Sequence, residues 1–209
     1  IGTEDRVNAV IKKAQDTGTA LRIGVNSGSL PVDIRNRMEQ EIREGRNADE
    51  ARAAALVAGA QREAALFDKH GFKQYLVSMK ASSVKETVLA NELFAARSTA
   101  PLHLGVTEAG PLVSGIVKST IAFSQLLERN IGATVRVSLS DTMENEVIAA
   151  REILTECGKR QGGIRLVSCP RCGRNGFDVH GFVTRWQHRL FAEKKNLTVA
   201  VMGCVVNGP

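Results

Sequence analysis

Short runs of β-branched and other apolar residues alternate with longer amphipathic stretches over the first three quarters of the chain. Four of the short runs predict strands, at residues 21–26, 74–79, 102–107 and 134–139. The amphipathic stretches before, between and after these runs predict five helices. This alternation is typical of a parallel sheet with right-handed crossover connections, so the predicted fold class is α/β.

Capping residues, glycine and asparagine mark the expected ends of the helices. The residues at or near predicted helix starts are Thr3, Asp49, Ser83, Ser114 and Asp141. Two of them, Ser83 and Asp141, have a glutamate three positions later, which is the spacing of a capping box. The predicted helix ends lie near Thr17, Gly71 and Asn130.

The pattern changes at residues 159–163, KRQGG, which are polar, basic and glycine-rich and predict a linker. Beyond this linker we expect a strand at 164–168, an amphipathic helix through 183–189 and a last strand at 197–203. The predicted domains are residues 1–158 and residues 159–209.

Composition narrows the class of protein. The chain has 209 residues, of which 43% are hydrophobic, enough for one core and a small second domain. Charged residues make up 24%, so we expect a soluble protein that does not enter membranes. The first residues have no features of a secretory signal, and the absence of an initiator Met suggests that the sequence begins inside a longer protein.

The net charge of +6 indicates an anionic partner, unless it is only the solvated surface of a basic protein. Aromatic residues are only 4% of the chain, whereas proteins that bind single strands interleave aromatic with basic residues. We therefore expect a phosphorylated small molecule or an acidic protein rather than nucleic acid.

Charged and polar residues occur in or directly after all four strands of the larger region. They are Arg22 and Asn26 in the first, Lys80 after the second, His103, Thr107 and Glu108 at the third, and Arg136 and Ser138 in the fourth. Ligand groups gather at the carboxyl ends of parallel strands, although each residue taken alone fits an ordinary surface loop.

Anion binding is the chemistry that these residue types favour. The two arginines and Lys80 can neutralise phosphate oxygens, and arginine can do so through two parallel hydrogen bonds. Ser27-Gly28-Ser29 offers hydroxyls and backbone N–H groups of the kind that cradle phosphates. In this cationic setting Glu108 is expected to donate or accept a proton.

Three of the four cysteines lie in the smaller region. Cys169 and Cys172 form a C-x-x-C pair, and Cys204 follows after 31 intervening residues. An iron–sulfur cluster with an exchangeable fourth position fits this spacing, and so does zinc completed by His180 or His188. A purely structural role and a dithiol redox pair also stay open. Cys157, before the linker, is expected to be a packed or free thiol.

Six segments resemble the 4-hydroxy-3-methylbut-2-en-1-yl diphosphate synthase family, in the family's order. They are RIGVNSGSL (22–30), VSMKAS (77–82), LHLGVTEAG (102–110), VRVSLS (135–140), SCPRCGR (168–174) and GCVVNGP (203–209). The resemblance implies the second half of a TIM-type (βα)8 barrel followed by a small α/β iron–sulfur domain. It also implies a two-electron reductive opening of 2-C-methyl-D-erythritol 2,4-cyclodiphosphate, in the methylerythritol phosphate route to isoprenoids.

The same resemblance assigns roles to residues. A 4Fe-4S cluster is implied on Cys169, Cys172 and Cys204, with a glutamate beyond Pro209 as the fourth ligand. The implied substrate-binding residues are Arg22, Asn26, Lys80, Thr107, Arg136, Ser138 and, near the cluster, Asn207, with Glu108 as the catalytic residue. The alternative is a non-catalytic module that binds a phosphate ligand and a structural zinc.

Partners and setting follow from the resemblance as well. Ferredoxin or flavodoxin is the expected electron donor, and we predict that a basic run, Lys159, Arg160, Arg165, Arg171 and Arg174, helps to dock it. The full-length enzyme is expected to be a homodimer, in the bacterial cytoplasm or in a plastid. Family members begin with about four further βα units, so the 209 residues alone are expected to be inactive.

Overall fold

The computed structural model describes residues 4–207, and the chain divides into two compact units, Ile1–Ile153 and Leu154–Pro209. The first unit contains α1 (Glu4–Thr17), β1 (Leu21–Asn26), the short 3-10 helix η1 (Ser27–Ser29), α2 (Val32–Arg43), α3 (Ala48–Lys69), β2 (Tyr75–Lys80), α4 (Val84–Ala95), β3 (His103–Gly105), α5 (Leu112–Glu128), β4 (Thr134–Arg136) and most of α6 (Met143–Glu156). The second contains β5 (Ile164–Ser168), α7 (Val179–Ala192) and β6 (Leu197–Val201). The α/β class is thereby confirmed.

The strands pair in parallel, as the alternation of elements predicts. β1 pairs with β2 so that Asn26 lies opposite Lys80, and β3 pairs with β4 so that Gly105 lies opposite Arg136. A parallel bridge between Val77 and the residue before β3 places these two pairs next to each other. The carboxyl ends of β1 to β4 therefore follow one another along one edge.

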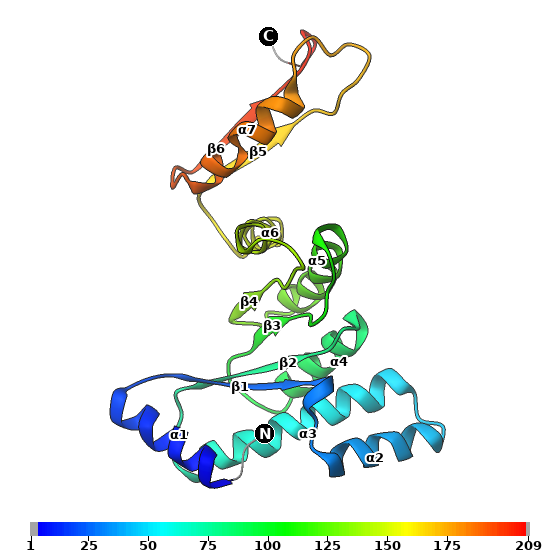
Figure 1. The fold of residues 1–209 in the computed structure, drawn as a ribbon, viewed down its shortest axis with the longest axis vertical. Helices are drawn as coiled ribbons and strands as arrows, with labels where there is room; N and C mark the ends of the chain where they lie inside the picture. The colour runs from blue at the N-terminus through cyan, green and yellow to red at the C-terminus, as the bar shows by residue number, and fades with distance from the viewer. Residues whose placement is uncertain (1–3, 208–209) are drawn as a thin grey trace. The chain divides into compact units, whose positions relative to one another are not determined.

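The two faces of these strands differ in chemistry. One face carries apolar side chains such as Ile23, Val25 and Met79, which are buried. The helices α3, α4 and α5 pack against these strands (Figure 1). α3 approaches closely because it has Gly59 at the contact, where a Cβ would lie 3.2 Å from a methyl of Val25. Side chains alternate along a strand, so the opposite face carries the charged residues of the strands.

Several predicted helix boundaries are confirmed. Ser83 caps α4, since its Oγ accepts a hydrogen bond from the Glu86 N–H at 3.3 Å. α3 ends at Lys69, and Gly71 follows with a φ of 63°, a conformation that costs glycine little. Thr3, the expected cap of the first helix, lies outside the described residues.

Two predicted helix starts are wrong. α5 begins at Leu112, not at Ser114, because Pro111 already has a φ of −67° and needs no N–H partner at the helix start. The cap of α6 is Thr142 rather than Asp141, because Thr142 directly precedes the first helical residue and its Oγ1 accepts from the Asn145 N–H.

α2 is a helix that the sequence analysis does not predict. It follows Pro31, and Ile34 is the one residue of this helix that is buried. Most of its side chains are polar, so the apolar stripe that would announce it is thin.

The second unit is a small β-α-β arrangement. β5 and β6 are parallel from the pair Ile164–Leu197 to the pair Ser168–Val201, and α7 lies along them (Figure 1). Asp178 caps α7 by accepting a hydrogen bond from the Gly181 N–H at 3.1 Å. Within residues 4–207, no helix combines the length and the apolar character that crossing a membrane requires.

Candidate functional site

Five side chains form a cluster on the charged face of the first unit, which we call the cationic face: Arg22, Lys80, His103, Thr134 and Arg136. Strand pairing brings them together from four strands, because Arg136 ends β4, Lys80 ends β2 and His103 begins β3. The sequence analysis names four of these residues at the strands.

His103 links two of these neighbours and is itself buried. The Arg22 guanidinium donates from Nη1 to Nε2 of His103 at 3.0 Å. Because arginine is only a donor, Nε2 is unprotonated, and Nδ1 carries the proton that it donates to Thr134 Oγ1 at 2.8 Å. Burial, and then the charges of Lys80, Arg22 and Arg136, lower the pKa of His103 to about 4. His103 is therefore a neutral acceptor that holds Arg22.

Lys80 lies in the midst of like charges. Burial lowers its pKa to about 8, and the charges of Arg136 and Arg22 act in the same direction. Its side chain passes over Gly105, where a Cβ would meet Lys80 Cε at 2.8 Å. A side chain at Gly105 would displace the amine, so this glycine gives Lys80 its place.

The other predicted substrate residues lie along the rim at the carboxyl ends. Asn26 ends β1 and is exposed, and Ser138 follows β4 half-buried. Thr107 donates its N–H to the Ala81 carbonyl at 3.1 Å, which ties the end of β3 to the end of β2. Asn26, Thr107 and Ser138 thus lie at the carboxyl ends of β1, β3 and β4, along the same edge as Lys80 at the end of β2.

Glu108 has an unusual backbone for a glutamate. Its φ is 52°, in the left-handed region, and its side chain is exposed at the rim just after β3. Such backbone costs free energy for a residue with a Cβ, and it clusters at functional sites. The left-handed turn thus places an exposed glutamate directly after the carboxyl end of β3.

The predicted phosphate cradle, Ser27-Gly28-Ser29, forms η1 directly after β1. The Ser29 hydroxyl donates to the Asn26 carbonyl and accepts from the Asn26 N–H, both at 3.2 Å. These local bonds engage the Ser29 side chain, so the cradle stays a prediction that rests on the other groups of the loop.

The second unit brings the C-x-x-C loop beside Cys204. The Gly203 N–H donates to Cys169 Sγ at 3.1 Å, and the Gly176 N–H donates to the Gly203 carbonyl at 2.7 Å. Hydrogen bonds from the backbone N–H groups of Asn207 and Val206 lower the pKa of the Cys204 thiol, and Arg174 acts in the same direction. Both loops therefore offer donors to sulfur.

Gly203 is closely packed where the two loops approach each other. A Cβ at this position would fall 1.9 Å from Oδ1 of Asn175 and 2.8 Å from a methyl of Val179. A larger residue here would force the side chains of Asn175 and Val179 to move.

The thiols have not converged on a single point. In the described part of the chain, no group of three or more His, Cys, Asp or Glu side chains is placed to share one metal ion. Cys169 is half-buried, Cys172 is exposed and Cys204 is buried, while His180 and His188 are exposed on α7. The thiol set remains a prediction, and the zinc set with a histidine is likewise not assembled.

Two residues of this region are not expected from the sequence: Thr134, which belongs to the cationic face, and Gly105, over which the Lys80 side chain passes. Thr134 begins β4, two positions before Arg136, which places both side chains on the same face. This period of two is the signal that could have identified Thr134. Gly105 has no such signal, because its role is the space that it leaves for Lys80.

Comparisons with known proteins bear on both units. The GcpE TIM-barrel domain matches residues 1–151, and the GcpE protein C-terminal domain matches residues 165–209. Curated relatives named 4-hydroxy-3-methylbut-2-en-1-yl diphosphate synthase (flavodoxin) are similar over the whole chain or nearly so. The chain is 68% identical to that of Treponema pallidum, 63% to that of Treponema denticola and 44% to that of Aquifex aeolicus.

The chain spans about half the length of these relatives. In the same order, the three matches include 100%, 100% and 99% of this chain, and 52%, 57% and 55% of the relative. The matches run through both the cationic face and the cysteine loops. They confirm the resemblance that the six motifs indicate.

Proposed function

The chain belongs to the GcpE family, and from this premise we propose that it supplies part of the substrate site and the cluster site of a 4-hydroxy-3-methylbut-2-en-1-yl diphosphate synthase. The proposed reaction is the two-electron reductive opening of 2-C-methyl-D-erythritol 2,4-cyclodiphosphate, with loss of a hydroxyl as water. The relatives' names support the reaction, and the site residues are our assignment.

The cationic face carries this proposal. Within residues 4–207, no carboxylate forms an ion pair with Arg22, Lys80 or Arg136. These cations nevertheless lie close together, because the charges of Arg136 and Arg22 lower the pKa of Lys80, and all three charges lower the pKa of His103. Gathering like charges without a counter-charge costs free energy, which a bound diphosphate would offset. Asn26, Thr107 and Ser138 add neutral donors at the rim, so that anion and sugar hydroxyls have separate partners.

We propose that β1 to β4 form the second half of a TIM-type barrel and that the cationic face lines its interior. The parallel register supports this, and so do the helices that cover only the apolar face. In such barrels the active site lies at the carboxyl ends of the strands, which is where the rim residues lie.

The three thiols of the second unit are proposed to hold a 4Fe-4S cluster. The donor set fits, because three cysteines lie on two adjoining loops and backbone N–H groups point at the sulfurs of Cys169 and Cys204. A bound cluster would supply electrons one at a time to the C–O bond that breaks. Asn207, whose N–H donates to the Cys204 carbonyl at 3.3 Å, is proposed to contact substrate near that cluster.

Glu108 is proposed as the residue that moves the proton. Glu108 is exposed just after the carboxyl end of β3, and the departing hydroxyl needs one proton to leave as water. The left-handed backbone at Glu108 holds this group in place while the cations hold the diphosphate.

The electron donor is proposed to be an acidic flavodoxin or ferredoxin that docks on the second unit. Residues 154–209 hold nine Lys and Arg against three Asp and Glu, a net charge of +6, which equals the surplus of the whole chain. A surplus of one sign steers an oppositely charged partner. Some of these cations are already paired, as Arg165 is with Glu156 and Arg171 with Asp178.

The test uses a full-length family member that carries this sequence, reconstituted with iron and sulfide without oxygen. We expect stoichiometric iron and acid-labile sulfide, and conversion of the cyclic diphosphate when reduced flavodoxin is supplied. Stoichiometric zinc without acid-labile sulfide, together with no turnover, would instead support the zinc-binding module. The predicted homodimer is checked on the same sample by light scattering.

A further inference from the structure

Thr87, one turn into α4, lies against the carboxyl end of β2. Its side chain is fully buried, and its hydroxyl accepts a hydrogen bond from the Ala81 N–H at 3.2 Å. The hydroxyl proton can go to the Ala81 carbonyl at 3.2 Å or to the Ser83 carbonyl at 2.9 Å. The Thr87 hydroxyl therefore lies within hydrogen-bonding distance of both the N–H and the carbonyl of Ala81, the residue directly after Lys80.

The hydrogen bonds of Thr87 are also linked, through Ala81, to the residue Thr107 after β3. The carbonyl of Ala81 accepts the Thr107 N–H at 3.1 Å, so Thr87, Ala81 and Thr107 form one chain of hydrogen bonds. Thr107 precedes Glu108 at the rim. Thr87 thus joins the ends of β2 and β3, which carry three of the residues proposed to act on substrate.

Asn91, one turn further along α4, holds the other side of Lys80. Its Nδ2 donates to the Met79 carbonyl at 3.2 Å and to the Thr87 carbonyl at 2.7 Å, and Asn91 is fully buried. Its Oδ1 is buried with no hydrogen-bond partner in the described part of the chain, which costs stability. An apolar residue would avoid this cost but could not bond the strand end.

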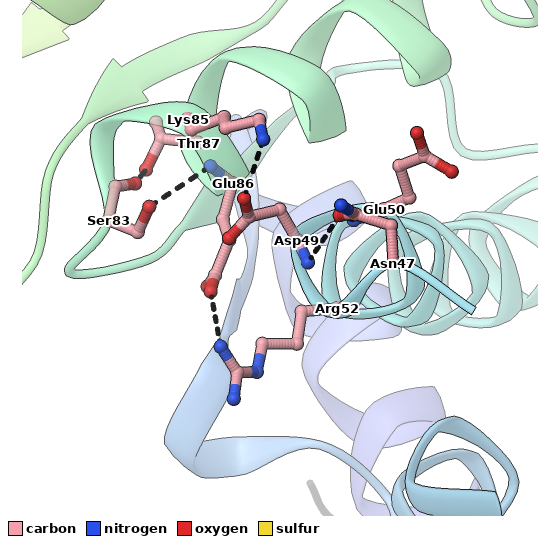
Figure 2. Close-up of polar contacts among 8 residues, drawn as sticks. All are labelled: Asn47, Asp49, Glu50, Arg52, Ser83, Lys85, Glu86 and Thr87. Carbon is pink, nitrogen blue, oxygen red and sulfur yellow. Dashed lines mark hydrogen bonds and ion pairs between the residues drawn. The ribbon is translucent and has the colours of Figure 1, made fainter. Parts of the chain in front are cut away.

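The start of α4 is itself anchored to the start of α3. Figure 2 shows Ser83 capping α4 and two ion pairs between the helices. Glu86 pairs with Arg52 at 3.0 Å, and Lys85 pairs with Asp49 at 2.8 Å. Glu86 is buried, so the Arg52 contact compensates a charge that could not stay unpaired. These pairs fix the helix from which Thr87 reaches the strand.

We propose that Thr87 and Asn91 are positioning residues that hold the backbone on both sides of Lys80 and, through Ala81, the backbone of Thr107. The proposal rests on the proposed function, since it takes Lys80 and Thr107 as ligand contacts. A long lysine side chain finds an anion readily only if its own Cα is fixed, because a small displacement at the rim lengthens every contact to the ligand. Neither Thr87 nor Asn91 touches the ligand in this arrangement.

The test measures the affinity of inorganic pyrophosphate and of the cyclic diphosphate by calorimetry, in a full-length family member that carries this sequence. Thr87→Val keeps the shape of the side chain and removes the hydroxyl, and we expect a loss of about three- to ten-fold, the size of one or two neutral hydrogen bonds. Thr87→Ser keeps the hydroxyl and should stay near the parent affinity. Asn91→Leu gives a second, independent variant if Thr87→Val does not fold.

Two controls separate positioning from general stability. Thr120→Val removes a hydroxyl that also bonds a helix carbonyl, that of Ile116 at 2.8 Å, but on the exposed side of α5, and it should leave affinity unchanged. In a Lys80→Met background the effect of Thr87→Val should shrink, because the residue that it positions is gone.

The proposal is overturned if Thr87→Val lowers the melting temperature and leaves both affinities unchanged, or if its effect on affinity is undiminished without Lys80. Failure of the parent protein to bind either ligand would instead refute the proposed function, and the positioning role with it. Parent-like binding by Thr87→Val and Asn91→Leu refutes the positioning role alone.

Discussion

The two units of this chain handle positive charge in opposite ways. Residues 1–153 hold 19 basic and 19 acidic residues and are neutral, yet three cations meet on one face of the sheet without an acidic partner among the described residues. Residues 154–209 carry a surplus of six positive charges, and the arginines of their cysteine loop are exposed. A neutral unit with a local cationic cluster suits a small anion, whereas an unbalanced surface suits a large acidic partner.

The units also differ in what holds their functional groups. In the first, strands paired in register and a buried core fix the cations, and His103 and Gly105 set the places of Arg22 and Lys80. In the second, the thiols lie on loops, fixed by backbone N–H groups. We infer that the first unit is preorganised for the proposed diphosphate, while the second would depend on the proposed cluster to draw the thiols together.

The largest effect is expected from the thiols. Cys169→Ser in a full-length family member should remove the cluster and the reductive activity together, because a hydroxyl does not replace a thiolate as an iron ligand. The measurement is iron and acid-labile sulfide per protein. Cys157→Ser is the matched control and should keep both, and a Cys169→Ser protein with a full cluster would contradict the assignment.

A smaller loss is expected on the cationic face. Arg136→Ala should weaken binding of the cyclic diphosphate by about one to two powers of ten, since it removes a charge-assisted contact to phosphate oxygen. Calorimetry gives the affinity, and iron content should not change. The exposed Arg97, in the loop after α4, provides the control, and an equal loss in Arg97→Ala would mean that the effect is one of net charge only.

The pH dependence of anion binding should distinguish Lys80 from the arginines. The pKa of Lys80 is about 8 in the fold against 10.5 ordinarily, so its positive charge is lost as pH rises through about 8. The affinity for pyrophosphate should therefore fall across about pH 7 to 9.5. A bound anion stabilises the charged lysine, which moves this pH range upward. Lys80→Arg should flatten this dependence.

Unfolding offers a check on the sign of the same effect. Between about pH 8 and 10.5 the unfolded chain keeps the Lys80 proton that the fold has lost, so this group makes the free energy of unfolding rise with pH. Lys80→Met should remove that contribution in chemical denaturation.

In the measurement of affinity against pH, a fall in Lys80→Arg equal to that of the parent protein would show that a group other than Lys80 titrates.

The smallest effect is expected at the docking surface. Reversing Lys159 and Arg165 to Glu should slow flavodoxin-driven turnover a few-fold and spare turnover with a small chemical reductant. The effect is expected at low salt, because the Debye length shortens from about 10 Å at 0.1 M to about 3 Å at 1 M salt. Reversal of Lys12 and Lys13 on α1 is the matched control. Equal slowing with both reductants would refute docking there.

The sequence predicts what depends on local rules. Strand runs, the parallel order and the residues at strand ends follow from the period of two and from the alternation with helices, and the structure brings Arg22, Lys80 and Arg136 together as expected. The start of α5 is missed because Pro111 outranks Ser114 as a helix start, which a capping pattern alone does not reveal.

The rest depends on tertiary contacts. Thr87 looks like an ordinary residue in the first turn of a helix, and its bond to Ala81 exists only because α4 packs on β2. Gly105 matters for the space above it. The spacing of the cysteines fits zinc and iron–sulfur equally, and only the family separates the two.

The most direct test of the division between the units is one paired measurement on Lys80→Ala and Cys204→Ser in a full-length family member: iron per protein, and affinity for inorganic pyrophosphate. We expect Lys80→Ala to keep its iron and to bind pyrophosphate at least about ten-fold more weakly, whereas Cys204→Ser should lose its cluster and bind pyrophosphate normally. If either variant loses both properties to the same degree, the two units do not divide the work in this way.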